Sequence, residues 1–197
     1  MFTGIVEHLG TVLTVDEVPR GRTFQVDTGP LAADVSVGDS IAVNGVCLTA
    51  VAVSTPAVTF QVMGETLDRT SIGHLGAGDV VNLERPMPAA GRFDGHIVQG
   101  HIDGVGTVRS VDADGEGSRM WVDVPADLMR YVVEKGSVTL DGVSLTVAGV
   151  DETGLEVALI PHTLAVTTLG RRRSGEKVNL EVDVLAKYVE RLLGAGR

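Results

Sequence analysis

Residues 41–53 read IAVNGVCLTAVAV, and residues 138–150, at an offset of 97, read VTLDGVSLTVAGV. Three further blocks align in the same order, two at this offset and one at 96: residues 63–67 with 160–164, 78–84 with 175–181, and 4–12 with 100–108. Such self-similarity within 197 residues indicates two copies of one domain of about 90 residues. Two copies predict either two copies of a ligand or one site built from two similar halves.

Composition and charge exclude several classes of protein. The net charge of −10 argues against nucleic-acid binding, which needs a cationic face. The basic run Arg171–Arg173 lies between glycine-rich turns and reads as a solvated loop. A single cysteine cannot form an internal disulfide, which fits a reducing compartment. No signal peptide is visible and no apolar run approaches 18 residues, so we expect a cytoplasmic protein without membrane contact.

The hydrophobic pattern favours strands. Most of both copies alternates with a period of two, and turn signals such as Asn44–Gly45 and Asp141–Gly142 recur at short intervals. About six short strands per copy predict a small closed antiparallel barrel. Two prolines within Arg85–Gly91 place the linker between the domains there. Short helices are expected at Leu31–Ala33 and, with proline near its start, at Pro125–Tyr131.

The C-terminal tail has a different period. Apolar residues recur at three- and four-residue steps, as Val182, Leu185, Val189, Leu192 and Leu193. This spacing predicts an amphipathic helix that the first copy lacks. A helix of about 12 residues is weak alone and must bury its apolar stripe. It either packs on its own domain or associates with the same helix of other subunits.

The repeated strand carries small polar residues on one face. Cys47 and Thr49 share one side of their strand, and Ser144 and Thr146 share the same side of its copy. The opposite sides are apolar and form the natural core: Val46, Leu48 and Ala50 in one copy, Val143, Leu145 and Val147 in the other. A lone cysteine is usually a small buried hydrophobe. A serine at the equivalent position weakens that interpretation, because both copies keep a polar group of nucleophile size.

Other candidates differ between the copies. Gly4 and Gly100 could offer backbone groups to a ligand at close approach. His101 is a candidate for moving a proton, although a lone histidine is usually structural. Lys135 in a turn and Glu65 are the remaining charged candidates, and such residues are most often solvated. Because reactive groups differ between similar halves, we expect two similar pockets that treat two similar molecules differently.

Several familiar sites are absent from the sequence. His96 and His101 are five residues apart, and no Cys, Asp or Glu completes a ligand set with them, so no metal site is predicted. The sequence contains no phosphate loop, no dinucleotide-binding glycine motif after a strand and no Gly-x-Ser-x-Gly elbow.

Four motifs resemble the riboflavin synthase alpha-chain family. They are Met1–Val6 (MFTGIV), Asn44–Thr49 (NGVCLT), Gly95–His101 (GHIVQGH) and Asp141–Thr146 (DGVSLT), and the likeness extends from residue 1 to the tail helix. The resemblance implies two six-stranded Greek-key barrels, residues 1–88 and 89–184, and a helix over residues 185–197 through which three subunits associate. It implies no cofactor and no metal, and it leaves association with lumazine synthase open.

The resemblance also implies a reaction. Two molecules of 6,7-dimethyl-8-ribityllumazine dismutate by transfer of a four-carbon unit, giving riboflavin and 5-amino-6-ribitylaminopyrimidinedione. Each barrel would bind one lumazine, and the site would form where the N-terminal barrel of one subunit meets the C-terminal barrel of another. The 7-methyl group is acidic because its carbanion delocalises into the ring. The protein would then mainly stack and orient the two rings, and proximity supplies roughly 7–11 kcal/mol at best.

Candidate site residues follow from the same resemblance. The first site would be lined by Gly4, Ile5, Val6, Cys47, Leu48, Thr49, Gln61, Val62, Met63, Gly64, Glu65 and Thr66. The second would be lined by Gly100, His101, Ile102, Lys135, Ser144, Leu145, Thr146, Ile160, Pro161, His162, Thr163, Leu164 and Ala165. Cys47 or Ser144 would add to ring carbon 7 of the acceptor or place a water there. His101 would carry the methyl proton, and Phe2 would close over the ring.

Two residues depart from the family pattern: His162 stands where some members carry glutamate, and Asp94 stands where glycine is common. The alternative function is that of a lumazine protein, which binds one chromophore as an optical antenna without turnover. Such proteins tend to lose reactive groups in the second copy, whereas Ser144, His101 and Lys135 are present here. A trimeric structural module would not explain the paired polar strands.

Overall fold

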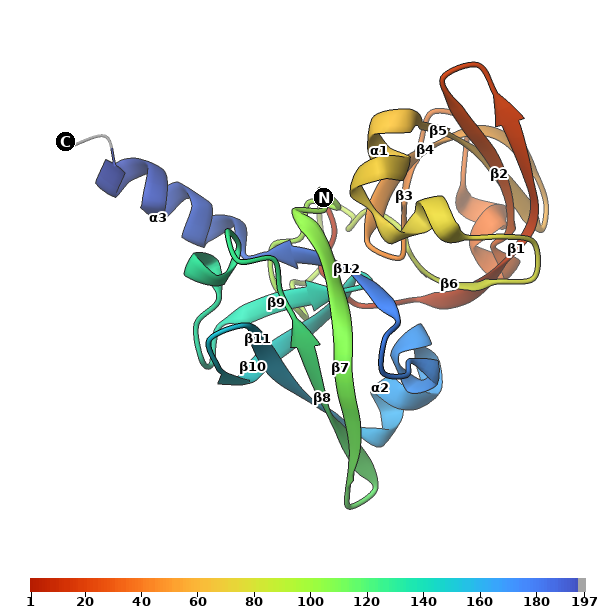
Figure 1. Cartoon of the computed structure of the whole chain (residues 1–197). Coiled ribbons are helices and arrows are strands. Elements are labelled where there is room, and N and C mark those ends of the chain that lie inside the picture. The colour runs from red at the N-terminus through yellow and green to blue at the C-terminus, as the bar shows by residue number, and fades with distance from the viewer. Residues whose placement is uncertain (195–197) are drawn as a thin grey trace.

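The computed structural model describes residues 1–194, which form two closed six-stranded antiparallel barrels and a C-terminal helix (Figure 1). The first barrel comprises β1 (His8–Val18), β2 (Gly21–Asp27), β3 (Ser40–Val43), β4 (Val46–Ser54), β5 (Ala57–Met63) and β6 (Val80–Glu84). The second comprises β7 (Gly104–Asp114), β8 (Gly117–Asp123), β9 (Ser137–Leu140), β10 (Val143–Val150), β11 (Gly154–Leu159) and β12 (Lys177–Val182). The expected fold is confirmed.

The two barrels share one topology in detail. Around the first barrel the strands run β1-β2-β5-β4-β3-β6, and the equivalent strands of the second barrel follow the same circular order. Bulges interrupt the register between Val12 and Thr14 and again between Ala50 and Ala52. The second barrel has its bulges at the equivalent places in β7 and β10. Bulges bend strands and raise their twist, which lets six short strands close into a barrel.

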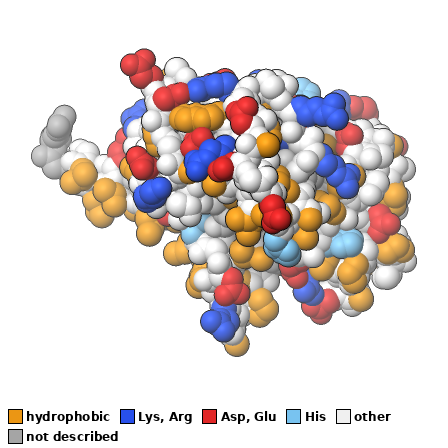
Figure 2. Space-filling view, turned by 90° about the horizontal axis from the view of Figure 1, so that it is seen from below, with side chains coloured by type: hydrophobic (Ala, Val, Ile, Leu, Met, Phe, Trp, Pro, Cys, Tyr) orange, Lys and Arg blue, Asp and Glu red, His pale blue; other side chains and the backbone are white. Residues whose placement is uncertain are grey.

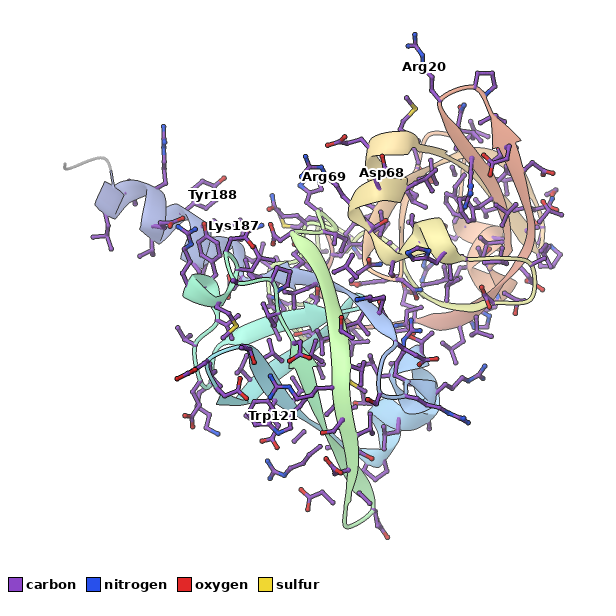
Figure 3. The ribbon with its side chains drawn as sticks, in the orientation of Figure 1. Arg20, Asp68, Arg69, Trp121, Lys187 and Tyr188 are labelled. Atoms are coloured by element: carbon purple, nitrogen blue, oxygen red, sulfur yellow. The ribbon has the colours of Figure 1, made fainter. Side chains whose placement is uncertain are left out.

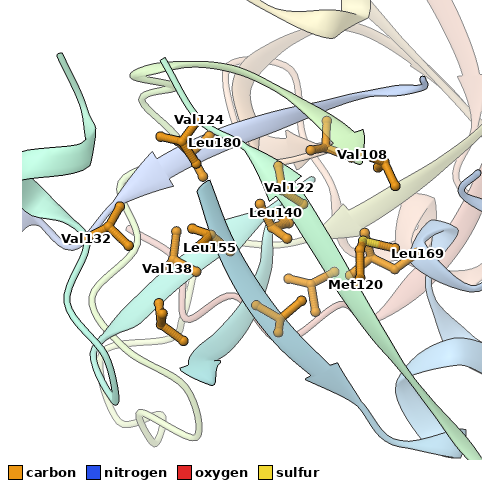
Figure 4. Packing of buried hydrophobic residues seen from close by; sticks show 14 of the residues in the cluster. Val108, Met120, Val122, Val124, Val132, Val138, Leu140, Leu155, Leu169 and Leu180 are labelled. Atoms are coloured by element: carbon orange, nitrogen blue, oxygen red, sulfur yellow. The ribbon is translucent and has the colours of Figure 1, made fainter. Parts of the chain in front are cut away.

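Each barrel has its own apolar core. The first is centred on fully buried side chains such as Ile41, Phe60 and Leu83. The second, shown in Figure 4, is built around Met120, Leu140, Leu155 and Leu180 among others. These residues come from alternate positions of the strands, as the period of two requires.

Short helices separate the strands. The expected helix at Leu31–Ala33 is a 3₁₀ segment, Gly29–Asp34, and Pro125–Tyr131 contains only the 3₁₀ turn Met129–Tyr131. Two further helices were not predicted: α1 (Gly64–Arg69) follows β5, and α2 (Pro161–Val166) follows β11. Six residues cover fewer than two turns, so their apolar period is too short to be recognised in a sequence.

The two barrels contact each other through pairs of equivalent interactions, in which each barrel contributes the same positions of its repeat. The side-chain nitrogen of Asn82 donates to the backbone oxygen of Asp141 at 2.9 Å, and that of Asn179 donates to the backbone oxygen of Asn44 at 2.8 Å. At the centre, a Cβ on Gly45 would lie 2.7 Å from the backbone nitrogen of Gly142, and the converse distance is also 2.7 Å. Equivalent residues therefore meet about an approximate twofold axis, as in an isologous interface.

Helix α3 (Val184–Gly194) projects from the second barrel (Figure 1). Its polar face contacts that barrel, since Lys187 pairs with Asp103 at 2.6 Å and Glu190 with Arg130 at 2.9 Å. Figure 3 shows Lys187 and Tyr188 at its base. The apolar side chains Leu185, Tyr188, Val189, Leu192 and Leu193 stay 55–75% exposed, and Figure 2 shows orange side chains gathered on this protrusion. The rest of the expected helix, residues 195–197, lies outside the described residues.

No helix among residues 1–194 is long and apolar enough to cross a membrane.

Candidate functional site

The polar residues of the repeated strands face away from the barrel cores, as the alternation predicted. In β4, Cys47 is half-buried and Thr49 is exposed, while Leu48 between them is buried in the core. In β10, Ser144 is half-buried and Thr146 exposed. Neighbouring strands add to this outer face, because Ser40 on β3 pairs with Thr49, and Ser137 on the equivalent strand β9 pairs with Thr146. Thr139, which pairs with Ser144, is fully buried.

The wall of each barrel opens beside these residues. The β4–β5 ladder begins at Ala50 and Phe60, so residues 46–49 pair with β3 alone. In the second barrel the β10–β11 ladder likewise begins at Val147 and Val157, so residues 143–146 pair with β9 alone. The ladders are therefore interrupted between β4 and β5 at residues 46–49, and between β10 and β11 at residues 143–146; we call these two interruptions the openings. Backbone and polar side chains border both openings.

The chain segments after β5 and β11 form the far side of each opening. Gln61 and Met63 on β5 are exposed and alternate with the core residue Val62. Glu65 is the second residue of α1, where it pairs with Arg69, which Figure 3 labels on that helix. In the second barrel the corresponding residues are Ile160, Pro161, His162, Thr163, Leu164 and Ala165, of which only Thr163 and Leu164 are half-buried.

Four of the candidate binding residues on β4, β5, β10 and α2 have side chains directed at the core of their own barrel. Leu48 and Val62 belong to the core of the first barrel, and Leu145 and Leu164 pack against that of the second. Their side chains are therefore placed to support the barrels, and only their backbone groups lie at the openings.

Two candidate segments, residues 4–6 and 100–102, each contact the opposite barrel; we call them the exchanged segments. The backbone nitrogen of Cys47 donates to the oxygen of Gly100 at 2.9 Å, and that of Ser144 donates to the oxygen of Gly4 at 2.7 Å. Farther along, Val6 packs against the core of the second barrel and Ile102 against that of the first. Grouping residues 4–6 with Cys47 and residues 100–102 with Ser144 was therefore wrong, because each segment crosses to the other barrel.

Phe2 does not close over either opening. Its side chain is fully buried and packs with Ala42, Val98 and Cys47, while its backbone pairs with Val98. In this structure the ring fills the space beneath Cys47, and closure of Phe2 over a bound lumazine ring stays a prediction. Phe2 instead supports Cys47 from the interior side.

His96 contacts Ser144 directly, which the sequence did not predict. The ring atom Nδ1 lies 2.8 Å from Ser144 Oγ, whereas Nε2 is buried without a hydrogen-bond partner among residues 1–194. Burial lowers the pKa of His96, partly offset by the negative charge of Asp183. The lowered pKa favours the neutral ring, whose Nδ1 can accept the hydroxyl proton of Ser144 when Nε2 carries the ring proton. Nothing in the local pattern links residues that are 48 positions apart.

The remaining charged candidates are exposed. His101 has an exposed side chain beside the Gly100 contact with Cys47. Lys135 lies in a left-handed turn with φ of 65°, and its side chain, 72% exposed, reaches only the carboxylate of Glu134 at 3.9 Å. Within residues 1–194, no three His, Cys, Asp or Glu side chains are arranged to hold a metal ion.

These features define a class: a duplicated barrel protein that presents two equivalent polar openings for a ligand with polar edges. The sequence model of the Lumazine binding domain matches residues 3–86 and 99–183, so the chain belongs to the lumazine-binding domain family.

Named relatives align with nearly the full length of this chain. The chain is 47% identical to a riboflavin synthase of Mycobacterium tuberculosis over 197 residues, covering 98% of both chains. It is 45% identical to a riboflavin synthase of Actinobacillus pleuropneumoniae over 193 residues, covering 98% of this chain and 90% of the relative. Among solved structures, LumP complexed with riboflavin superposes with a TM-score of 0.85 at 26% identity, covering 92% of this chain and 99% of that one.

Proposed function

We propose that this chain is a riboflavin synthase, a transferase that converts two molecules of 6,7-dimethyl-8-ribityllumazine into riboflavin and 5-amino-6-ribitylaminopyrimidinedione. The observation that carries the proposal is the pair of equivalent openings, each bordered by a nucleophile-sized side chain, Cys47 in one barrel and Ser144 in the other. In a dismutation one substrate molecule is the donor and an identical molecule is the acceptor. Two similar sites with different side chains could bind the same molecule in these two roles.

Each opening would hold one lumazine. The N–H groups of Cys47 and Ser144 are bound by Gly100 and Gly4, so the pyrimidine edge would meet the exposed side chains of Thr49 and Thr146 and the remaining backbone groups of β4 and β10. The polar outer faces suit a ribityl chain. Holding the rings in a reactive orientation would supply most of the rate, because the 7-methyl carbanion is stabilised by the substrate itself. No metal or cofactor enters this mechanism.

The side chains would divide the proton and addition steps. Cys47 or Ser144 would add to ring carbon 7 of the acceptor lumazine, or place a water there. His96, neutral and 2.8 Å from Ser144, would accept the hydroxyl proton, while the exposed His101 would carry the methyl proton of the donor. Lys135 would reach substrate only across a contact between subunits, since its side chain is exposed in the single chain.

A homotrimer would complete the site in this proposal, with the N-terminal barrel of one subunit facing the C-terminal barrel of the next. The support is α3, whose apolar side chains lie open to solvent beside a groove of about 650 Å³ that includes Tyr131 and Val133. Sedimentation velocity measures whether the protein is a trimer in solution. The same measurement with lumazine synthase added tests whether the two proteins associate. A cytoplasmic location belongs to the same proposal.

Incubation of the purified protein with 6,7-dimethyl-8-ribityllumazine alone, followed by absorbance, tests the function. One riboflavin formed per two lumazines consumed, with nothing else added, is the expected result. Tight binding without conversion would instead identify a chromophore-binding protein such as LumP, which has been crystallised with riboflavin.

Replacement of Cys47 by alanine is expected to lower kcat about tenfold, less than the roughly 10²–10⁴-fold typical of a general acid or base, because orientation of the two rings supplies most of the rate. Ser144→Ala at the equivalent position should have an effect of similar size through the other lumazine. Ser54→Ala, at the exposed far end of β4, is the matched control and should leave kcat unchanged. Full turnover by the Cys47 variant would exclude that thiol from the chemistry.

A further inference from the structure

Two buried glutamates occupy equivalent positions at the ends of β6 and β12. Glu84 is 5% exposed and Glu181 is 1% exposed. Neither forms an ion pair within 4 Å among residues 1–194, and both carboxylates instead accept hydrogen bonds from consecutive backbone N–H groups. A carboxylate held by successive amides is a strong, charge-assisted arrangement.

The amides that Glu181 binds belong to the exchanged segment beside Cys47. Oε1 accepts the N–H of Gln99 at 2.7 Å, and Oε2 accepts those of Gly100 at 2.9 Å and His101 at 3.1 Å. The oxygen of Gly100 in turn accepts the N–H of Cys47 at 2.9 Å. A continuous chain of hydrogen bonds thus runs from the second barrel to the candidate nucleophile of the first.

Glu84 makes the reciprocal chain. Its Oε1 accepts the N–H of Thr3 at 2.6 Å and the Thr3 hydroxyl at 2.9 Å, and its Oε2 accepts the N–H of Gly4 at 3.0 Å. The oxygen of Gly4 accepts the N–H of Ser144 at 2.7 Å. Each barrel therefore orders the backbone that borders the opening of the other barrel.

We propose that Glu84 and Glu181 are positioning residues, each of which fixes the segment beside the opposite barrel's reactive side chain. This inference rests on the proposed function for its consequence in catalysis, and on the hydrogen bonds alone for its structural content. Two carboxylates are needed because the crossing segments pair with each other as strands only at Phe2 and Val98 within residues 1–194. The amides of residues 3–4 and 99–101 bind the carboxylates in place of a strand, since buried amides need acceptors.

The positioning requires the ionised carboxylates. Burial raises the pKa of Glu181 to about 7, against the lowering effect of the Gln99 and Gly100 amides. The charged groups that face it are Lys187 on α3 and Asp103 at the end of the linker, which pair with each other at 2.6 Å. The amide hydrogen bonds favour the ionised form, whereas burial favours the protonated one. Protonation as the pH falls through about 7 therefore weakens the amide bonds while Glu181 stays buried, so the segment 99–101 should loosen on the acid side of neutrality.

The test compares Glu181→Gln with Glu84→Gln and with Glu176→Gln, an exposed glutamate that accepts only the N–H of Arg173. Glutamine keeps the shape but turns an amide NH₂ toward the backbone donors. In Glu181→Gln, hydrogen exchange at residues 99–101 should accelerate at least tenfold, with residues 3–4 unchanged. Glu84→Gln should show the converse, and Glu176→Gln neither change.

Turnover gives the second measurement. Both glutamine variants at buried positions should lose about tenfold in kcat, with KM changed less than threefold, and Glu181→Gln should lose the wild-type decline below pH 7. A kcat within twofold of wild type, or exchange accelerated equally throughout both barrels, would overturn the inference. If the wild-type protein itself forms no riboflavin, the proposed function fails. The hydrogen-exchange rates at residues 3–4 and 99–101 then decide alone whether the glutamates position these segments.

Discussion

Gly100→Ala is expected to lower the rate of riboflavin formation about a hundredfold and to destabilise the fold by about 3 kcal/mol. Gly100 has φ of 75°, where a side chain costs about 1–2 kcal/mol. A Cβ there would also lie 2.7 Å from Cys47 Cβ and 3.1 Å from a ring carbon of Phe2. Relieving that overlap costs about 1–3 kcal/mol more and moves Cys47, and a shift of about 1 Å can reduce a rate 10²-fold.

Gly78→Ala is the matched control for this prediction. Its φ is 93°, yet nothing lies within 4 Å of the added Cβ. It should therefore show the backbone cost alone, about 1–2 kcal/mol, with kcat retained. Urea unfolding and the lumazine assay on both variants separate the two effects. Equal losses in the two proteins would mean that the close approach to Cys47 has no consequence for the site.

The second large effect is expected at an ion pair with a buried carboxylate, formed within residues 1–194, that the second copy has and the first lacks. Asp141, whose side chain is fully buried, accepts from Arg172 at 2.7 Å, and Arg172 is 21% exposed. The first copy has Asn44 and Leu75 at these positions. Arg172→Leu should destabilise the protein by about 3–5 kcal/mol, because it leaves a buried carboxylate without its partner. The loss should shrink toward acidic pH, where Asp141 becomes protonated.

The first copy supplies the control for that experiment. Adding Asp141→Asn to Arg172→Leu recreates the uncharged combination of Asn44 and Leu75, and it should recover most of the lost free energy of unfolding. Asn44 tolerates burial although its side-chain nitrogen has no hydrogen-bond partner among residues 1–194. A double variant no more stable than Arg172→Leu would show that the arginine contributes by packing rather than by pairing. Equilibrium denaturation at pH 7 measures all three proteins.

Much of the fold was predictable because it depends on local rules. Alternation of apolar and polar residues places Leu48 in the core and Thr49 outside, whatever the remainder of the chain does. The aligned blocks then require that the second copy follow the first, and the circular strand order of both barrels agrees. Helices α1 and α2 were missed because six residues carry no readable period.

The candidate site was predictable only in part. The outward positions of Cys47 and Ser144 followed from alternation, and the candidate segments followed from the family resemblance. The grouping of those segments did not, because Gly4 and Gly100 leave their own barrels. Contact of a segment with the opposite barrel depends on the path of the linker between the barrels. It cannot be predicted from the residue pattern within either copy.

Repetition and alternation in the amino-acid order were enough to establish two barrels, their inner and outer faces and the paired polar strands, since each follows from contacts between near neighbours. Only the folded chain showed that Glu181 holds the backbone beside Cys47, that Glu84 does the same for Ser144, and that His96 meets Ser144. Those contacts join residues between 48 and 81 positions apart. They arise from how two closed barrels pack against each other, and the free energy of that packing is not visible in any local stretch of sequence.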